Sequence, residues 1–447
     1  MPLRRAALVL ASLFAVAPAA SGQTGLRDLL TNFLQQGITL APPPLVGGVS
    51  HIAHFNSLDS PQFIAIRQFS DTLAIQLSTL PLPSSAGGFS YRYDPAAGFT
   101  RVTESFGPVY AERYETLGKG RANLGLSYNH FTFDRINDMS LTNGDVKLVF
   151  THAPVPIYVA GDVITANLSL HLTTDVTAFV FSYGISDRFD VGLALPIERV
   201  SLSAQTDATI RRLATGPTDN PPTIHRFPGE TSTATFRQSG TATGVGDVLL
   251  RGKFQVAGGQ QGGLAVEGNV RLPTGEERDL LGAGVTQFTG SIVASVRFGG
   301  FSPHVNAGYT TATQPKDDRS EADKAALLPR RAIPDQISYT GGFDWAVHPR
   351  ITVAVDVLGR TFRKGQFVSV QNQTFLATTN ENPPRNVSAV FPRLTSVTKD
   401  STSWTGSVGV KVNPFGTLLV TANTLFSLNR EGLQDKFTPL IALEYSF

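Results

Sequence analysis

Cysteine is absent from this chain of 447 residues, so neither disulfide bonds nor thiolate metal sites can contribute to its fold. Charge is scarce as well, because Asp, Glu, Lys and Arg make up 16% of the residues, against roughly 25% in an ordinary soluble domain. The formal net charge is only +2, which argues against nucleic acid as a partner. Past the N-terminus, no apolar run is long enough to cross a bilayer as a helix. Low charge without a helical span indicates a large β-protein, and a membrane barrel is one form of it.

Catalytic patterns are missing too. The 8 histidines are scattered, and neither G-x-S-x-G nor H-E-x-x-H occurs. An outer-membrane lipase, protease or deacylase needs a nucleophile with histidine and a carboxylate in reach. His304, with Ser291 and Ser295, is expected near the periplasmic end of a barrel and not at the outer leaflet. We therefore predict that the chain is no enzyme and uses no metal or cofactor.

The first 22 residues have the composition of a secretory signal peptide. Arg4 and Arg5 precede an apolar stretch from Ala6 to Ala17, and small residues follow. This stretch is shorter than the roughly 20 residues of a spanning helix. We predict cleavage near Gly22 and export to the outer membrane of a Gram-negative cell.

Residues 23–117 are expected to form an N-terminal extension. The spacing of one helix face is shared by Leu26, Leu29, Leu30, Phe33 and Leu34. The stretch "APPPLVGG" then ends the helix, and strand-like pieces rich in Gly, Pro and Ser follow. We expect either a plug in the lumen or a segment at the periplasmic rim, with an extra hairpin within residues 62–117 as an alternative.

Residues 118–447 alternate apolar and polar side chains, which predicts an all-β fold. We count about twelve strands, or fourteen with the N-terminal hairpin, each long enough for a transmembrane antiparallel β-barrel. They are predicted at residues 122–134, 164–183, 188–204, 247–256, 262–274, 286–299, 301–314, 338–347, 350–360, 404–412, 416–429 and 437–447. The alternation shifts near Thr174, which suggests a bulge or a turn there.

The predicted connections fall into two classes. Short turns lie around Ser186 and at residues 257–263, 298–302, 347–350 and 413–416. They alternate with long polar loops at residues 205–243, 275–285, 315–335 and 364–400. Short turns on one side and long loops on the other are typical of an outer-membrane barrel, whose short turns are periplasmic.

The last predicted strand ends in "FTPLIALEYSF". Its outward face carries Ile441, Leu443, Tyr445 and Phe447, which we expect to contact outer-membrane lipid. Phe447 is expected in the periplasmic aromatic girdle. A final Phe after alternating apolar residues also resembles the feature that the barrel-assembly machinery recognises.

Four stretches carry a family resemblance. They are "GRANLGLSYNHFTFD" (120–134), "YGISDRFDVGLALPI" (183–197), "GVGDVLLRGKF" (244–254) and "GGLAVEGNVRLPTGEERDLLGAG" (262–284). Over roughly residues 115–447 the chain resembles the outer-membrane barrel family named for the MetA pathway of phenol degradation. Its barrels are similar in outline to the fatty-acid and toluene transporters. The resemblance implies uptake of aromatic or other poorly soluble compounds and transfers no binding residues.

Charged and amide side chains on the inward face of the strands are the candidate lumen lining, because a strand at membrane depth can hold charge there. The candidates are Arg251, Lys253, Glu267, Asn269, Arg271, Asp344, Asp356, Arg360 and Lys411, together with Arg297, His304 and Glu444. They could form a ladder of salt bridges that fills the barrel, or a pathway that attracts anionic groups such as carboxylates. We expect Arg251, Lys253, Glu267 and Arg271 to lie close together.

Three loop stretches have alternative interpretations. "RLPTGEERDLLGAG" (271–284) resembles a binding loop but is expected to be an extracellular turn, because no Gly-Lys-Ser/Thr follows it. "AALLP" (325–329) and "VSAVFP" (387–392) could cover the barrel mouth as a lid, or pack on its rim.

We therefore predict an outer-membrane channel for passive uptake of small, poorly soluble aromatic or fatty compounds. The alternative is a structural or adhesin-type barrel without transport, and a hydrolase is less favoured than either.

Overall fold

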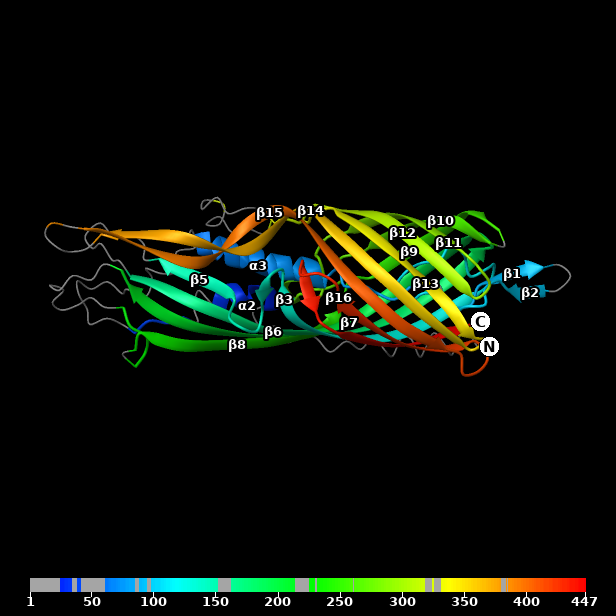
Figure 1. The fold of residues 1–447 in the computed structure, drawn as a ribbon, viewed down its shortest axis with the longest axis horizontal. Helices are drawn as coiled ribbons and strands as arrows, with labels where there is room; N and C mark the ends of the chain where they lie inside the picture. The colour runs from blue at the N-terminus through cyan, green and yellow to red at the C-terminus, as the bar shows by residue number, and fades with distance from the viewer. Residues whose placement is uncertain are drawn as a thin grey trace.

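A computed structural model describes residues 25–33, 38–41, 61–84, 88–94, 98–151, 162–213, 225–229, 231–259, 261–317, 324, 331–378, 383 and 385–447. The predicted signal peptide, Leu34 and the stretch 325–329 lie outside these residues. The fold is a closed antiparallel barrel of 12 strands, as predicted (Figure 1). Its strands are β3 (Ala122–Ile136), β6 (Asp162–Ser186), β7 (Phe189–Arg212), β9 (Leu249–Gly258), β10 (Gly262–Arg271), β11 (Gln287–Val296), β12 (Phe301–Ala312), β13 (Gln336–His348), β14 (Ile351–Thr378), β15 (Asn386–Val412), β16 (Leu418–Ser427) and β18 (Thr438–Ser446).

The barrel closes between its first and last strands, β3 and β18. The backbone N–H of Ala122 donates to Phe447 O at 2.8 Å, and the Phe447 N–H donates back at 2.9 Å. Closure removes the free sheet edge that lipid could not satisfy. Among the described residues, no helix is both long and apolar enough to cross a membrane.

The outer surface of the barrel carries a band of exposed apolar side chains. They come from alternating positions, for example Phe179 and Phe181 of β6, and Ile441 and Leu443 of β18. Aromatic side chains mark both borders of the band. In β12, Phe301 and Tyr309 are both outward and exposed, and at ~3.3 Å per residue along a tilted strand they are ~20 Å apart in height. This band matches the hydrocarbon layer of an outer membrane.

Four strands are much longer than the others and extend beyond the membrane band at the outer end (Figure 1). β6 and β7 have 25 and 24 residues, and β14 and β15 have 28 and 27. The long loop predicted at 364–400 is therefore wrong over most of its length, and the one at 205–243 is wrong at its two ends, into which β7 and β8 (Thr233–Val245) extend. The predicted lid 387–392 is likewise part of β15. Their polar composition reflects strands whose outer face meets water, not lipid.

The bulge predicted near Thr174 is also wrong. The pairing of β6 with β7 is continuous from Asp162↔Arg212 to Gly184↔Asp190. Inward positions stay inward throughout. Between Thr174 and the periplasmic end of the strand, the outward side chains are apolar. Between Thr174 and the outer end, the inward side chains are apolar, including Leu168 and Leu170. The apolar face changes because lipid surrounds the lower half, whereas the outer half encloses an apolar core.

One strand of the barrel wall is interrupted. β8 (Thr233–Val245) pairs with the upper part of β7 and β9 with its lower part, so they count as one barrel strand. Residues 246–248 separate them. Within this break, the Asp247 carboxylate accepts hydrogen bonds from the backbone N–H groups of Gly275 (3.1 Å) and Ala283 (2.8 Å). Asp247 thus anchors the connection between β10 and β11 to the wall.

The two helices of the N-terminal extension lie inside the barrel. Helices α2 (Leu26–Asn32) and α3 (Pro61–Leu77) occupy the outer half between the long strands (Figure 1). α2 confirms the predicted helix, and it packs so closely on β8 that a Cβ at Gly240 would lie 2.6 Å from Leu26 Cδ2. α3 was not predicted, although Pro61 is at the first helical position, where it is favoured.

The remaining strands are short. β1 (Tyr91–Asp94) and β2 (Gly98–Arg101) form a separate two-stranded sheet at the periplasmic end (Figure 1). The fourteen-strand alternative is therefore wrong, because this hairpin does not join the barrel. At the outer rim lie β4 (Met139–Ser140), β5 (Val146–Thr151) and β17 (Leu433–Asp435), all paired to β3 or β6.

Candidate functional site in the lumen

Residues 102–117, here called the lumenal segment, connect the β1–β2 hairpin to the barrel and run along the inside of its wall. Their side chains are almost all buried, and Tyr114 is 0% exposed. The segment makes hydrogen bonds and ion pairs to inward side chains of β9 to β14. The lumen at membrane depth is therefore occupied by part of the same chain.

Glu112 is the centre of this attachment. Its Oε1 lies 2.6 Å from Arg251 Nη1, and its Oε2 lies 3.3 Å from Lys253 Nζ. Its backbone N–H donates to Asn306 Oδ1 at 2.8 Å, and its carbonyl accepts from Asn306 Nδ2 at 2.9 Å. The Ser84 hydroxyl adds a hydrogen bond of 2.7 Å to the carboxylate. One residue of the segment thus engages both the β9 wall and the β12 wall.

The ionisation of Glu112 follows from these contacts. Burial acts to raise the pKa of its carboxyl, but the cations of Lys253 and Arg251 and the Ser84 hydroxyl outweigh it. The pKa therefore lies below its ordinary value. The carboxylate is charged at neutral pH, which makes it an anionic ligand of the wall.

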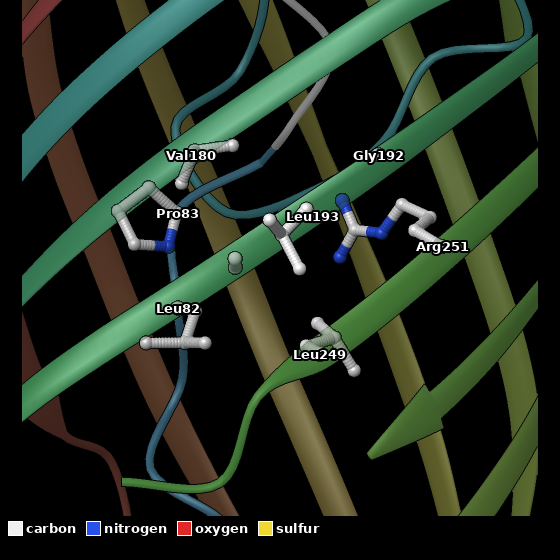
Figure 2. A pocket seen from close by; sticks show the side chains of 8 residues that line it. Leu82, Pro83, Val180, Gly192, Leu193, Leu249 and Arg251 are labelled. Carbon is white, nitrogen blue, oxygen red and sulfur yellow. The ribbon is translucent and has the colours of Figure 1, made fainter. Parts of the chain in front are cut away.

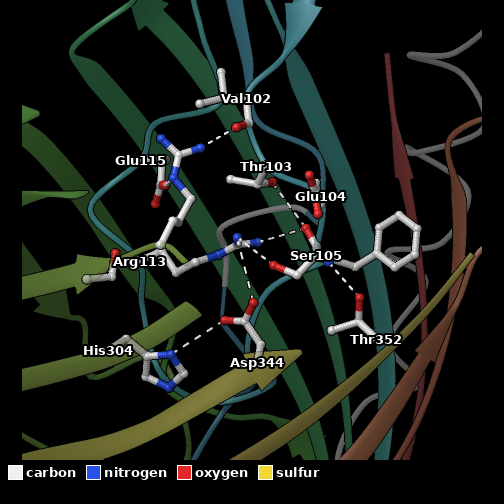
Figure 3. A network of polar contacts seen from close by, with 12 residues as sticks. Val102, Thr103, Glu104, Ser105, Arg113, Glu115, His304, Asp344 and Thr352 are labelled. Atoms are coloured by element: carbon white, nitrogen blue, oxygen red, sulfur yellow. Dashed lines mark hydrogen bonds and ion pairs between the residues drawn. The ribbon is translucent and has the colours of Figure 1, made fainter. Parts of the chain in front are cut away.

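A second network joins the segment to β12, β13 and β14. Figure 3 shows the Arg113 guanidinium between Ser105 and Asp344, with Asp344 turned toward His304. Arg113 lies 3.9 Å from Asp344, and His304 lies 3.5 Å from Asp344 and 2.6 Å from Asp356. Both ring nitrogens of His304 thus face carboxylates. No nitrogen is left to activate Ser295, whose hydroxyl accepts from the backbone of Tyr114 at 3.3 Å.

The periplasmic end of the segment is attached separately. The Tyr114 hydroxyl donates to Gly259 O at 2.8 Å, and Arg297 lies 3.5 Å from Glu115 and also donates to Val102 O. The Leu117 N–H donates to Asp190 at 2.8 Å. The chain continues from this end of the segment into β3, so the segment is covalently joined to the wall here.

The structure brings some predicted lumen residues together and separates others. Arg251, Lys253 and Glu267 form one cluster, in which Arg251 Nε lies 3.4 Å from Glu267 and donates to Asn269 Oδ1 at 3.0 Å. Arg271 makes no hydrogen bond or ion pair with these described residues, and it lies within electrostatic range of Asp247, Glu198 and Arg251. Lys411 is 2% exposed and pairs with Glu444 at 3.0 Å. Arg360 donates to the backbone carbonyl of Thr79, just after α3.

Sequence reasoning missed the partners in the N-terminal extension. Glu112, Arg113 and Glu115 were not among the predicted lumen residues, because the alternation used to place side chains applies only to strands. A detectable feature was present, since "AERYE" concentrates three charges just before the first barrel strand in a chain that is otherwise poor in charge.

A third group of ion pairs lies at the outer end, where it holds α2. Arg27 lies 2.8 Å from Asp71 of α3 and 2.6 Å from Glu277, and Glu277 also lies 2.9 Å from Arg331. Glu277 begins the short 3-10 helix η3 (Glu277–Asp279). The stretch 271–284 is thus the connection between β10 and β11, and it contacts the plug helices.

Around α2 and α3, the inward side chains are apolar. The cluster includes Leu30, Phe63, Phe69 and Leu73 of the helices, packed with residues of β5 to β7 such as Leu168 and Leu202. The interior is therefore apolar in the outer half of the barrel and polar at membrane depth. A small pocket lies lower, where Leu82 and Pro83 pack against Val180, Leu249 and Arg251 (Figure 2). It has room for about one water molecule.

Comparisons with known proteins give one family match and several similar solved structures. Residues 156–355 match the family described as "Putative MetA-pathway of phenol degradation", which confirms the predicted resemblance and includes three of the four sequence stretches, all but 120–134. Similar solved structures include an outer membrane channel from Pseudomonas putida F1, with 12% identity, a TM-score of 0.39, and 75% of this chain and 98% of that chain covered. A Pseudomonas aeruginosa FadL homologue has 12% identity, a TM-score of 0.30, and coverage of 81% and 96%. The Ralstonia pickettii toluene transporter TbuX has 12% identity, a TM-score of 0.26, and coverage of 74% and 90%. No curated protein matches the chain.

Proposed function

We propose that this chain, an outer-membrane β-barrel that matches the family named for the MetA pathway of phenol degradation, is a channel for passive uptake of small, poorly soluble organic compounds. The main support is that the lumen is occupied by a segment held through polar contacts, with Glu112 at its centre. Hydrogen bonds and ion pairs can be exchanged for water when the segment moves. A barrel that served only as a support would not need a separable filler.

The apolar core around α2 and α3 supports the class of compound. Burying apolar surface provides about 25 cal/mol per Å², so a hydrophobic compound can gain binding energy where helices now pack against the long strands. In the proposed mechanism, the outer half captures the compound. Movement of the lumenal segment then opens a path through the polar lumen or the wall.

The proposed partners follow from the surfaces. The exposed apolar band contacts outer-membrane lipid, and the C-terminal strand with Phe447 is recognised by the barrel-assembly machinery. No nucleic acid or cofactor takes part.

A structural or adhesin-type barrel is the second candidate. Its support is the 28 and 27 residues of β14 and β15, which form a long hairpin beyond the membrane band (Figure 1). Such a barrel would keep its lumen closed under all conditions.

Liposome swelling and single-channel conductance separate the two. The full chain would be compared with a variant that lacks residues 23–117, and with the variant Glu112→Gln in case the truncation does not fold. Resistance to denaturation in unheated gel samples would establish that each barrel is folded. We expect a mostly closed full-length protein and conductance in both variants. Folded variants that pass no small solute would overturn the channel and favour the structural role.

A further inference from the structure

Arg271, Gln287 and Arg360 each carry at least one hydrogen-bond donor that has no acceptor among the described residues. Arg271 makes no hydrogen bond or ion pair with any described residue, although Asp247 and Glu198 are within electrostatic range. Gln287 is its direct cross-strand neighbour and is 4% exposed, and the Nε2 of Gln287 has no partner among the described residues. Side chains directly opposite on neighbouring strands have Cβ atoms about 5 Å apart.

Arg360 adds a further donor from the other side of the lumen. It is within electrostatic range of Arg271. One of its nitrogens donates to Thr79 O, while its buried Nε has no partner among the described residues. A guanidinium offers five N–H donors. Leaving buried donors unpaired costs free energy, so this arrangement is suited to a ligand with acceptors.

The nearby carboxylates do not accept hydrogen bonds from these donors. Both oxygens of Asp247 already accept backbone N–H groups, from Gly275 and Ala283. Glu198 has an oxygen, Oε2, that is buried without a partner among the described residues. Two guanidiniums and two carboxylates sum to zero formal charge, so the group tolerates a singly charged anion better than a dianion such as phosphate.

An apolar surface adjoins these donors. The ring of Phe362 lies 5.2 Å from the Arg360 guanidinium carbon. It belongs to a buried cluster with Ile75, Val285, Ile333 and Phe367. A ligand that reached the guanidiniums could therefore place an apolar body against this cluster.

We propose that Arg271, Gln287 and Arg360 form a binding site for an organic monocarboxylate, with its carboxylate on the two guanidiniums and its apolar body on the Phe362 cluster. This inference rests on the proposed uptake function and narrows its substrate class from poorly soluble compounds in general to small aromatic or aliphatic acids. Planar guanidinium donors match a carboxylate in a two-bond geometry.

The test is equilibrium binding of radiolabelled benzoate and octanoate to the full-length protein in non-ionic detergent. Their amides, benzamide and octanamide, have the same shape without the charge. We expect the amides to bind at least tenfold more weakly than the acids, which corresponds to about 1.4 kcal/mol. Equal affinity for acids and amides would overturn the site.

Variants locate the binding. Arg271→Gln and Arg360→Gln should each weaken benzoate binding at least tenfold and leave benzamide binding unchanged. Arg363→Gln is the matched control, because Arg363 is nearly half exposed and pairs with Asp400 at 2.9 Å. Gln287→Met, which removes a donor without changing charge, should weaken benzoate binding severalfold and covers the case in which an arginine variant does not fold. Unchanged benzoate binding in the folded variants would also overturn the proposal.

The outcomes also separate this site from the channel itself. If carboxylates bind but no solute passes in the swelling experiment, the binding site is supported and the channel function is rejected. If neutral solutes pass but carboxylates do not bind, the channel function is supported and the binding site is rejected.

Discussion

The Glu112 carboxylate of the lumenal segment lies 2.6 Å from the Arg251 guanidinium of the barrel wall. The two residues are 139 positions apart in the chain, and both are mostly buried. Removing one partner of a buried pair costs roughly 3–5 kcal/mol, because the other charge is left without compensation. The attachment of the lumenal segment therefore depends strongly on this one contact.

Replacing Glu112 by Gln should loosen the segment while keeping the size of the side chain. We expect open-channel events in planar bilayers at neutral pH, where the unmodified protein is mostly closed. Glu104→Gln is the control, because Glu104 is in the same segment and exposed. A closed Glu112→Gln channel, or equal opening in both variants, would contradict the role of this ion pair.

Acid should open the unmodified protein through the same group. The pKa of Glu112 is lowered from its ordinary value of 4.5, so the ionised carboxylate favours the attached state. This stabilisation is complete above the ordinary value and is lost as the pH falls through the lowered pKa. We expect conductance to rise as the pH falls below 4.5. The share due to Glu112 is the part of this rise that is missing in Glu112→Gln, and identical pH profiles would refute it.

A disulfide between α2 and η3 should block opening if the plug helices must move. A Cβ on Gly25 would lie 2.8 Å from the Cβ of Arg278, so the two backbones must separate by roughly 1 Å to reach the 3.5–4.5 Å of a disulfide. Because the chain has 0 cysteines, Gly25→Cys with Arg278→Cys can form only the intended bond. We expect swelling rates at least tenfold lower when oxidised, with recovery in dithiothreitol.

A matched pair within the wall controls for the oxidation itself. A Cβ on Gly300 would lie 3.2 Å from the Cβ of Ala346, so Gly300→Cys with Ala346→Cys joins β13 to the turn before β12 without touching α2 or α3. Its swelling rate should not depend on oxidation. Passage that is independent of oxidation in both pairs would show that α2 stays in place during uptake.

Asp247→Asn should weaken the connection between β10 and β11. The carboxylate accepts two backbone N–H groups, whereas the amide offers one oxygen. A hydrogen bond to a charged group contributes about 1.5–3 kcal/mol, so we expect a lower thermal midpoint by circular dichroism at a fixed scan rate. Asp279→Asn, in the same connection, should leave the midpoint unchanged. Equal midpoints for both variants would mean that other contacts hold the connection.

The barrel could be predicted from the sequence because lipid on one side and a polar lumen on the other impose a strict alternation. The alternation rule failed in the outer half of the barrel, where the strands no longer separate lipid from a polar lumen. In β6, Leu168 and Leu170 are inward because the outer half of the barrel encloses α2 and α3. No local pattern distinguishes an apolar face against lipid from one against a plug, so a continuous strand was interpreted as a bulge.

The lumen site was predictable only in part, for a related reason. The alternation places Arg251 and Lys253 inward, but their partner Glu112 comes from a segment outside any strand, 139 and 141 positions away. Arg271 seemed part of the same cluster because it is on a neighbouring strand. Arg271 lies nearer the outer end of the barrel, opposite Gln287. The position of a residue along its strand, and not only the choice of strand, decides which charges are in contact.

The seam between β3 and β18 also determines the order of assembly. Ser446 and Asn123, hydrogen-bonded at 2.9 Å across this seam, are 323 positions apart in the chain. The wall therefore cannot close until β18, the last strand of the barrel, has been synthesised. Closing a loop over so many residues costs conformational entropy, so we expect this seam to form late in folding.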